Sequence, residues 1–392
     1  EQAAGRFEES ASRCEQAYWL ARELDQAAIA LESALCVARV RGVRLGQTEP
    51  ALDWVRQAEA MLPRAGEPTL AAARLHDIVA SIHWARGDAA TALPHHDRAI
   101  RAYEQARPSS PRLLAVALNN RANVLADLGR LSDAIESQRQ AVAILGRELG
   151  EEHELTAVTR CALGSLLTDA GDPEALRQLD RGLETLARRV PPDHVWRVQA
   201  LANRGLAHRR LDDLPRARAD MEAALEAAAT VPGQVGIDVR VGVGTNLGDL
   251  LLRLGEPAAA RRRFEAARAL AHDELGRGDE RSLLLAIHVA QIDAAAQQTA
   301  AAAATRLRET IDAATEHDQP DAAAMARFEL ARLLAPTDPP QARALAEAAL
   351  AHWRERPPRR SVIAPFPSSA TERAAEIDRW LADLGPTAPH PP

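Results

Sequence analysis

The sequence predicts an all-α fold, a right-handed superhelical solenoid of about eight helix–turn–helix units that ends in a C-terminal capping helix. Two observations support this prediction. The composition is 46% hydrophobic but only 3% aromatic, and the alanines and leucines that supply most of the apolar surface favour closely packed helices over sheets. In addition, one short pattern returns along most of the chain. It reads LSDAIESQRQAVAI at 131–144 and PAAARRRFEAARAL at 257–270.

The repeated pattern places small and large residues at helical spacing. An anchor alanine is followed four residues later by a residue that is often larger, and seven residues later by another small one. These spacings share one helical face, so a second helix can approach closely there. Ser137, three residues after an anchor, is expected on the outer surface. The anchors lie 39 to 43 residues apart, at Ala51, Ala92, Ala134, Ala175, Ala217, Ala260, Ala303 and Ala342.

Another helix-forming stretch and a helix breaker precede most anchors. Glycine commonly ends a helix because it adopts left-handed backbone angles without strain. One helix–turn–helix unit cannot bury its own apolar face, so neighbouring units must stack. We therefore assign residues 25–353 to a stacked array. The breakers are Gly46, Gly87, Gly129, Gly171 and Gly255.

The two ends of the chain differ from the repeat. Residues 1–24 are predicted to form an N-terminal helix, either a cap or the remnant of an upstream repeat. Residues 354–369 read as a proline-rich connector. Apolar residues at helical spacing predict a capping helix over 370–384, and 385–392 are expected to form a disordered tail.

The repeat resembles the tetratricopeptide repeat family. The matching features are a small residue in the first helix (Gly164, Gly205, Gly248), the turn glycine, and the small–large–small pattern of the second helix. The period near 42 residues is similar to that of the kinesin-light-chain-like variety, and the segment GEEHE at 150–154 strengthens that likeness. The resemblance covers roughly residues 30–350. It implies a bacterial protein that binds proteins or extended peptides.

Charge and composition exclude several classes of function. All 48 basic residues are arginine, so neither a Schiff-base lysine nor a GxxxxGK phosphate loop is possible. The net charge of −7 argues against general nucleic-acid binding. No apolar run is long enough to span a membrane. The glycines of VGVGTNLG at 241–248 lack a preceding strand and fit close helix packing better than a nucleotide loop. We therefore expect neither an enzyme nor a cofactor.

The three cysteines predict no disulfide. Cys14, Cys36 and Cys161 lie far apart in the sequence and form no CxxC motif, so neither a zinc ribbon nor a disulfide framework is indicated. Reduced thiols in a cytoplasmic protein are the expectation.

One cluster of histidines raises the alternative of a metal site. His76 and His83 fall on the inward face of a first helix, and His96 is the large residue of the following anchor helix. Three histidines that point into one interior are a possible zinc ligand set. Hydrogen-bonded or partly exposed histidines in an imperfect repeat are the favoured alternative, because a spacing of seven residues spans about 10 Å along a helix.

A polar stripe along the first helices is the predicted binding surface. The face opposite the anchor-packing face is expected to line the concave side of the superhelix, which holds extended peptides in the family that the array resembles. An asparagine amide donates and accepts hydrogen bonds at once, which suits a peptide backbone. A plain solvated face is the alternative. The predicted peptide-binding residues are Asn120, Asn123, Asp127, Asp169, Asn203, Arg210, Asn246, Asp249 and Arg253.

These observations lead to one functional prediction with two alternatives. The prediction is a non-catalytic scaffold that binds a protein or extended peptide in its concave groove, with a covalent or non-covalent effector domain outside this chain as a possible partner. The alternatives are the ligand- or peptide-sensing portion of a bacterial transcriptional or signalling regulator, and an accessory subunit of an enzyme.

Overall fold

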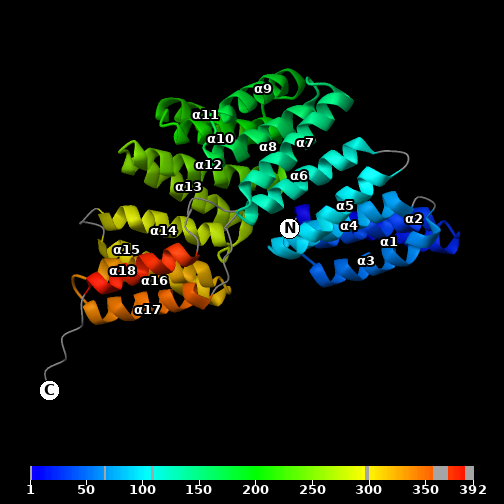
Figure 1. Ribbon diagram of the computed structural model, residues 1–392. Helices are drawn as coiled ribbons and strands as arrows, with labels where there is room; N and C mark the ends of the chain where they lie inside the picture. The colour runs from blue at the N-terminus through cyan, green and yellow to red at the C-terminus, as the bar shows by residue number, and fades with distance from the viewer. Residues whose placement is uncertain (1, 66–67, 107–109, 296–299, 356–369, 385–392) are drawn as a thin grey trace. The chain divides into compact units, whose positions relative to one another are not determined.

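The structure, a computed structural model, describes residues 2–65, 68–106, 110–295, 300–355 and 370–384 (Figure 1). This described part is built from helices, without a β-strand. The helices are α1 Gln2–Glu23, α2 Ala27–Arg39, α3 Thr48–Met61, α4 Pro68–Ala85, α5 Ala89–Gln105, α6 Pro111–Asp127, α7 Leu131–Leu149, α8 Glu154–Ala170, α9 Glu174–Arg189, α10 Val195–Arg210, α11 Leu214–Ala228, α12 Gly233–Arg253, α13 Pro257–Leu275, α14 Glu280–Ala295, α15 Ala300–Glu316, α16 Pro320–Leu334, α17 Pro339–Glu355 and α18 Ala370–Asp383. A π-helical turn, Val40–Arg44, continues α2, and a 3-10 turn, Leu62–Arg64, follows α3.

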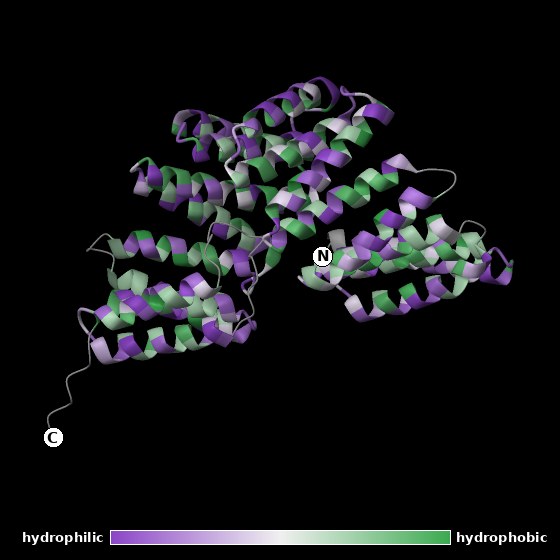
Figure 2. Ribbon diagram, in the orientation of Figure 1, coloured by the Kyte–Doolittle hydropathy of each residue, from purple (hydrophilic) through white to green (hydrophobic). Residues whose placement is uncertain are grey.

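Consecutive helices pack as pairs, which confirms the predicted all-α repeat fold. Eight such pairs run from α2 with α3 to α16 with α17, and each anchor lies in the second helix of its pair. At the two ends, α1 packs against α2, and α18 packs against α17. The chain divides into two compact units, Glu1–Pro191 with α1–α9 and Pro192–Pro392 with α10–α18. Figure 2 shows the polar and apolar residues interleaved along the helices of each unit.

The repeated residues form the contact between the paired helices. Every anchor is buried, and so is every residue four positions after an anchor. The small residues at the anchor and seven positions later leave space between the paired helices. The side chain four positions after the anchor fills this space, and we call that residue the plug. The plugs are Val55, His96, Gln138, Leu179, Met221, Phe264, Leu307 and Ala346.

Left-handed residues occur in the turns inside the first six pairs. The five breaker glycines have positive φ angles between 67° and 82°, which glycine adopts without strain. The turn between α10 and α11 has no glycine, and Asp212 takes its place with a φ of 63°. Asp and Asn tolerate this conformation better than other non-glycine residues. The unit of Ala217 therefore has the same left-handed turn as its neighbours, although its sequence lacks the turn glycine.

The prediction for Ser137 is wrong. This side chain is buried rather than on the outer surface, and its Oγ donates a hydrogen bond of 2.9 Å to the main-chain oxygen of Leu118 in α6. The reason is that α7 contacts α6 and also α8. A second helix between two neighbours buries a wider face than the anchor spacing alone indicates.

The cysteine prediction also needs correction. Cys14 of α1 and Cys36 of α2 form a disulfide, with Cα atoms 6.2 Å apart, while Cys161 is buried and takes no part in it. The packing of α1 against α2 brings the two residues together although 22 positions separate them.

The ends of the array are only partly described. In α1, Ala11, Tyr18 and Ala21 are buried on one face of the helix, whereas Trp19 and Leu20 are exposed. The proline-rich connector, apart from its first two residues at the end of α17, and the predicted tail lie outside the described residues. Within the described part, no helix combines the length and the apolar character needed to cross a membrane.

Candidate functional site

The polar stripe of the first unit lies on α6 and α8. Asn120, Asn123 and Asp127 are half-buried in α6, and Asp169 is exposed near the end of α8. Asp127 accepts a hydrogen bond of 2.6 Å from Trp84 Nε1 in α4. One carboxylate of the stripe therefore also ties two neighbouring pairs together, a role that the sequence pattern did not indicate.

The polar stripe of the second unit lies on α10 and α12. Asn203 and Asn246 are half-buried at equivalent positions of the two helices, while Arg210 and Arg253 are exposed. Neither asparagine side chain forms a hydrogen bond with another described residue of the chain. Each amide therefore offers a donor and an acceptor to a molecule outside the protein.

The charged residues beside these asparagines are partly neutralised within the protein. Arg253 donates a hydrogen bond of 3.0 Å to Asp212 and one of 3.3 Å to the main-chain oxygen of Arg209. Burial raises the pKa of Asp249 to about 6, although the positive charge of Arg209 opposes that rise. Burial lowers the pKa of Arg209, and Asp249 works against this shift. Arg253 and Arg209 thus lie beside the carboxylates of Asp212 and Asp249, and this part of the stripe offers less unpaired positive charge than separate arginines would.

The α4–α5 pair contains four histidines. The three that lie together are His76, His83 and His95, whereas the prediction grouped His76 and His83 with His96. The ring centroid of His95 in α5 lies 5.5 Å from that of His76 and 6.0 Å from that of His83. The buried His96 lies apart from this group, with Nδ1 3.1 Å from Asp77 Oδ1. The sequence reasoning missed His95, and the adjacent pair of histidines at 95–96 was the only signal that pointed to it.

The histidine arrangement does not match a zinc site. In the part of the chain that the structure describes, no three His, Cys, Asp or Glu side chains are placed to hold one metal ion. His76, His83 and His96 do not converge, because His96 faces Asp77 and His83 Nδ1 lies 3.6 Å from Asp88. Burial, followed by the charges of His76 and Arg98, lowers the pKa of His95 to about 4. Burial and Arg98 also lower the pKa of His76, against a smaller opposite effect of Glu59.

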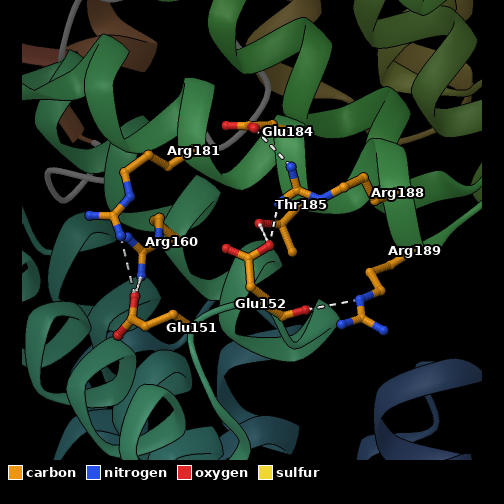
Figure 3. A network of polar contacts seen from close by, with 8 residues as sticks. All are labelled: Glu151, Glu152, Arg160, Arg181, Glu184, Thr185, Arg188 and Arg189. Carbon is orange, nitrogen blue, oxygen red and sulfur yellow. Dashed lines mark hydrogen bonds and ion pairs between the residues drawn. The ribbon is translucent and has the colours of Figure 1, made fainter.

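A separate polar network fixes the loop between α7 and α8 (Figure 3). Glu151 pairs with the buried Arg160, while the Glu152 carboxylate pairs with Arg188. Arg189 Nε donates a hydrogen bond of 3.1 Å to the main-chain oxygen of Glu152. The contacts join the loop to α8 and α9 and fall in the GEEHE segment. They satisfy one another, so this network is structural rather than a binding site.

A family model described as "Tetratricopeptide repeat" matches residues 113–185, which run from α6 into α9. Residues 113–185 are tetratricopeptide repeats. The match covers two helix pairs, α6 with α7 and α8 with α9, and the same pairing of helices continues on both sides of it. No protein of curated function matches the sequence.

Several solved structures are similar to this chain. A Rap protein complexed with Competence and Sporulation Factor is 16% identical with a TM-score of 0.55, covering 88% of this chain and 98% of its own. The apo quorum sensor NprR from B. thuringiensis is 12% identical with a TM-score of 0.54, covering 93% and 99%. A putative kinesin light chain from Podosopora anserina is 19% identical with a TM-score of 0.43, covering 51% and 95%. At such identities the similarity concerns the fold.

Proposed function

We propose that the chain is a non-catalytic scaffold that binds an extended peptide along the polar stripe of its first helices. The observation that carries the proposal is the pair of equivalent asparagines, Asn203 and Asn246, whose amides have no partner among the described residues. Two amides on neighbouring first helices suit a peptide backbone, which presents donors and acceptors whatever its sequence.

Two of the similar structures favour a ligand-binding role. The similar Rap protein was solved with a factor bound, and NprR is named as a quorum sensor. By analogy of fold, the present chain would act either as a plain scaffold or as the sensing portion of a bacterial signalling or transcriptional regulator with an effector outside this chain. In either case the remaining stripe residues of each unit would take part in binding within that unit.

The charges beside the stripe would orient the peptide rather than hold it. Within the first unit Asp127 and Asp169 would favour a basic part of a peptide, and within the second unit Arg210 with Arg253 would favour an acidic part. Exposed ion pairs contribute at most about 1 kcal/mol, whereas loss of a shielded hydrogen bond costs roughly 1–3 kcal/mol.

The test begins with an array of random ten-residue peptides, from which binders of the full chain are selected. Asn203→Ala and Asn246→Ala should each weaken the selected peptide more than Arg253→Ala does at physiological salt, while Glu222→Ala on the second helix α11 serves as the control. If both asparagine variants bind like the parent, the stripe is not the site.

A cytoplasmic location is also a proposal. It is at odds with the Cys14–Cys36 disulfide, because the cytoplasm keeps most thiols reduced. The test is acid quenching of native cells followed by labelling of free thiols. Full labelling of Cys14 and Cys36 would mean that both are reduced, as expected in the cytoplasm, whereas absence of labelling would mean that the disulfide is present and would contradict a cytoplasmic location.

A further inference from the structure

A partly enclosed pocket of about 200 Å³ lies in the second unit, between α14, α16, α17 and α18. Its wall is apolar where Phe328, Trp353 and Ile377 meet, and Trp380 closes the aromatic group with a ring contact of 5.7 Å to Phe328. This volume is below the roughly 300–1,000 Å³ of sites for drug-sized molecules. It suits a ligand of amino-acid size.

Charged groups of both signs line the same pocket. Glu329 and Arg332 come from α16, and Arg373 and Glu376 come from α18. The guanidinium carbon of Arg332 lies 6.0 Å from the centre of the Phe328 ring, and that of Arg373 lies 5.0 Å from that of Trp353. The aromatic faces thus hold the arginine groups at the wall of the pocket.

Glu329 is more enclosed than Arg332, with a side chain that is 18% exposed against 51% for Arg332. Burial raises its pKa, with a further contribution from the negative charge of Glu376, although Arg332 and a hydrogen bond from Gln291 oppose the rise. The neighbouring groups of the protein therefore balance the negative charge of the Glu329 carboxylate only in part, and a positively charged group of a ligand beside it would be stabilised.

The contact between Glu329 and Arg332 leaves room for a ligand. Arg332 Nη1 lies 3.4 Å from Glu329 Oε1, at the weak end of hydrogen-bond distances, and half of the Arg332 side chain is exposed. A molecule that brings its own ammonium to Glu329 and its own carboxylate to Arg332 would replace one weak contact by two stronger charge-assisted ones.

We propose that this pocket binds a free α-amino acid with an apolar side chain. Its ammonium would lie between Glu329 and Glu376, its carboxylate would face Arg332, and its side chain would lie against Phe328 and Trp353. Because Glu376 and Ile377 belong to α18, the bound amino acid would also hold the C-terminal helix on the array. The site is separate from the proposed peptide groove and does not depend on it.

The test is calorimetric titration of the full chain with L-leucine and two blocked analogues. N-acetyl-L-leucine lacks the ammonium, and L-leucinamide lacks the carboxylate. Each analogue should therefore bind at least about tenfold more weakly than leucine. Leucine should also raise the melting temperature. No heat at about 10 mM leucine, where even a weak ligand is detected, or equal binding of leucine and leucinamide, would overturn the proposal.

Variants locate the binding within the molecule. Glu329→Gln and Arg332→Gln should each weaken leucine about tenfold, whereas Glu347→Gln, an exposed carboxylate of α17 outside the pocket, should bind like the parent. Thermal melts followed by circular dichroism establish that each variant is folded. Because the Arg332 side chain is half exposed, its replacement should leave the fold stable. Unchanged binding by both pocket variants would place the leucine elsewhere and contradict the proposal.

Discussion

Replacing Ala134 by leucine tests whether the anchors set the distance between paired helices. Ala134 is fully buried, in a cluster with Ala122 of α6, Leu125 of α6 and Leu166 of α8. Leucine adds three carbon atoms, which would stabilise the fold by roughly 2.4 kcal/mol if the site had space for them. Because neighbours surround Ala134 on both sides, we expect overpacking instead, at a cost of about 1–3 kcal/mol.

The matched control lies on the same helix. Ala143 of α7 is exposed, so Ala143→Leu should change the free energy of unfolding by about 0.5 kcal/mol or less. For a unit of this size, the loss at Ala134 corresponds to a melting temperature lower by roughly 2–12 °C. Urea and thermal denaturation followed by circular dichroism measure both variants. Equal effects at Ala134 and Ala143 would refute the packing that the anchors predict.

Ser137→Leu should now behave like Ala134→Leu, because Ser137 is buried and hydrogen-bonded.

Two further predictions concern the first unit. The pKa of His95 lies near 4 in the folded chain and near 6.5 in the unfolded one, so the unfolded state binds more protons as the pH falls. The free energy of unfolding should therefore drop by roughly 1–2 kcal/mol for this group between pH 7 and pH 5, and less in His95→Gln; identical urea titrations of parent and variant at both pH values would contradict this. Reduction of the Cys14–Cys36 disulfide releases a loop of 22 residues, which should destabilise α1 by about 3 kcal/mol. Cys14→Ser should melt like the reduced parent, and a dithiothreitol effect that persists in Cys14→Ser would show that another cause is at work.

The repeat was predictable because its physical cause recurs. Each pair closes at an anchor alanine, so the same constraint acts on the sequence every 39 to 43 residues. The disulfide was not predictable in this way. It depends on the packing of α1 against α2, a contact that occurs once at the end of the array and leaves no periodic signal.

The candidate site was only partly predictable for a similar reason. Helical spacing placed Asn203 and Asn246 at one register, and the structure finds both half-buried and unpaired within the described residues. It could not show that Trp84 binds Asp127 or that Arg253 binds Asp212, because these partners lie 43 and 41 residues away. The pocket around Glu329 escaped notice altogether, since α18 completes it from beyond the connector.

Departures from the repeat mark where the core carries polar chemistry. Where the plug is Leu179 or Met221, the facing first helix has glycine: a Cβ on Gly164 would lie 2.6 Å from Leu179 Cγ, and one on Gly205 would lie 2.9 Å from Met221 Cγ. Where the plug is Gln138, its amide instead donates to Asn119 Oδ1 and to the main-chain oxygen of Thr159. A large apolar plug thus requires space, whereas a polar plug requires a partner. Since the polar plugs His96 and Gln138 are adjacent in the array, α4 to α8 form the part of the core whose packing includes polar contacts, with Asp77 beside His96 and with Asn119 and Thr159 around Gln138.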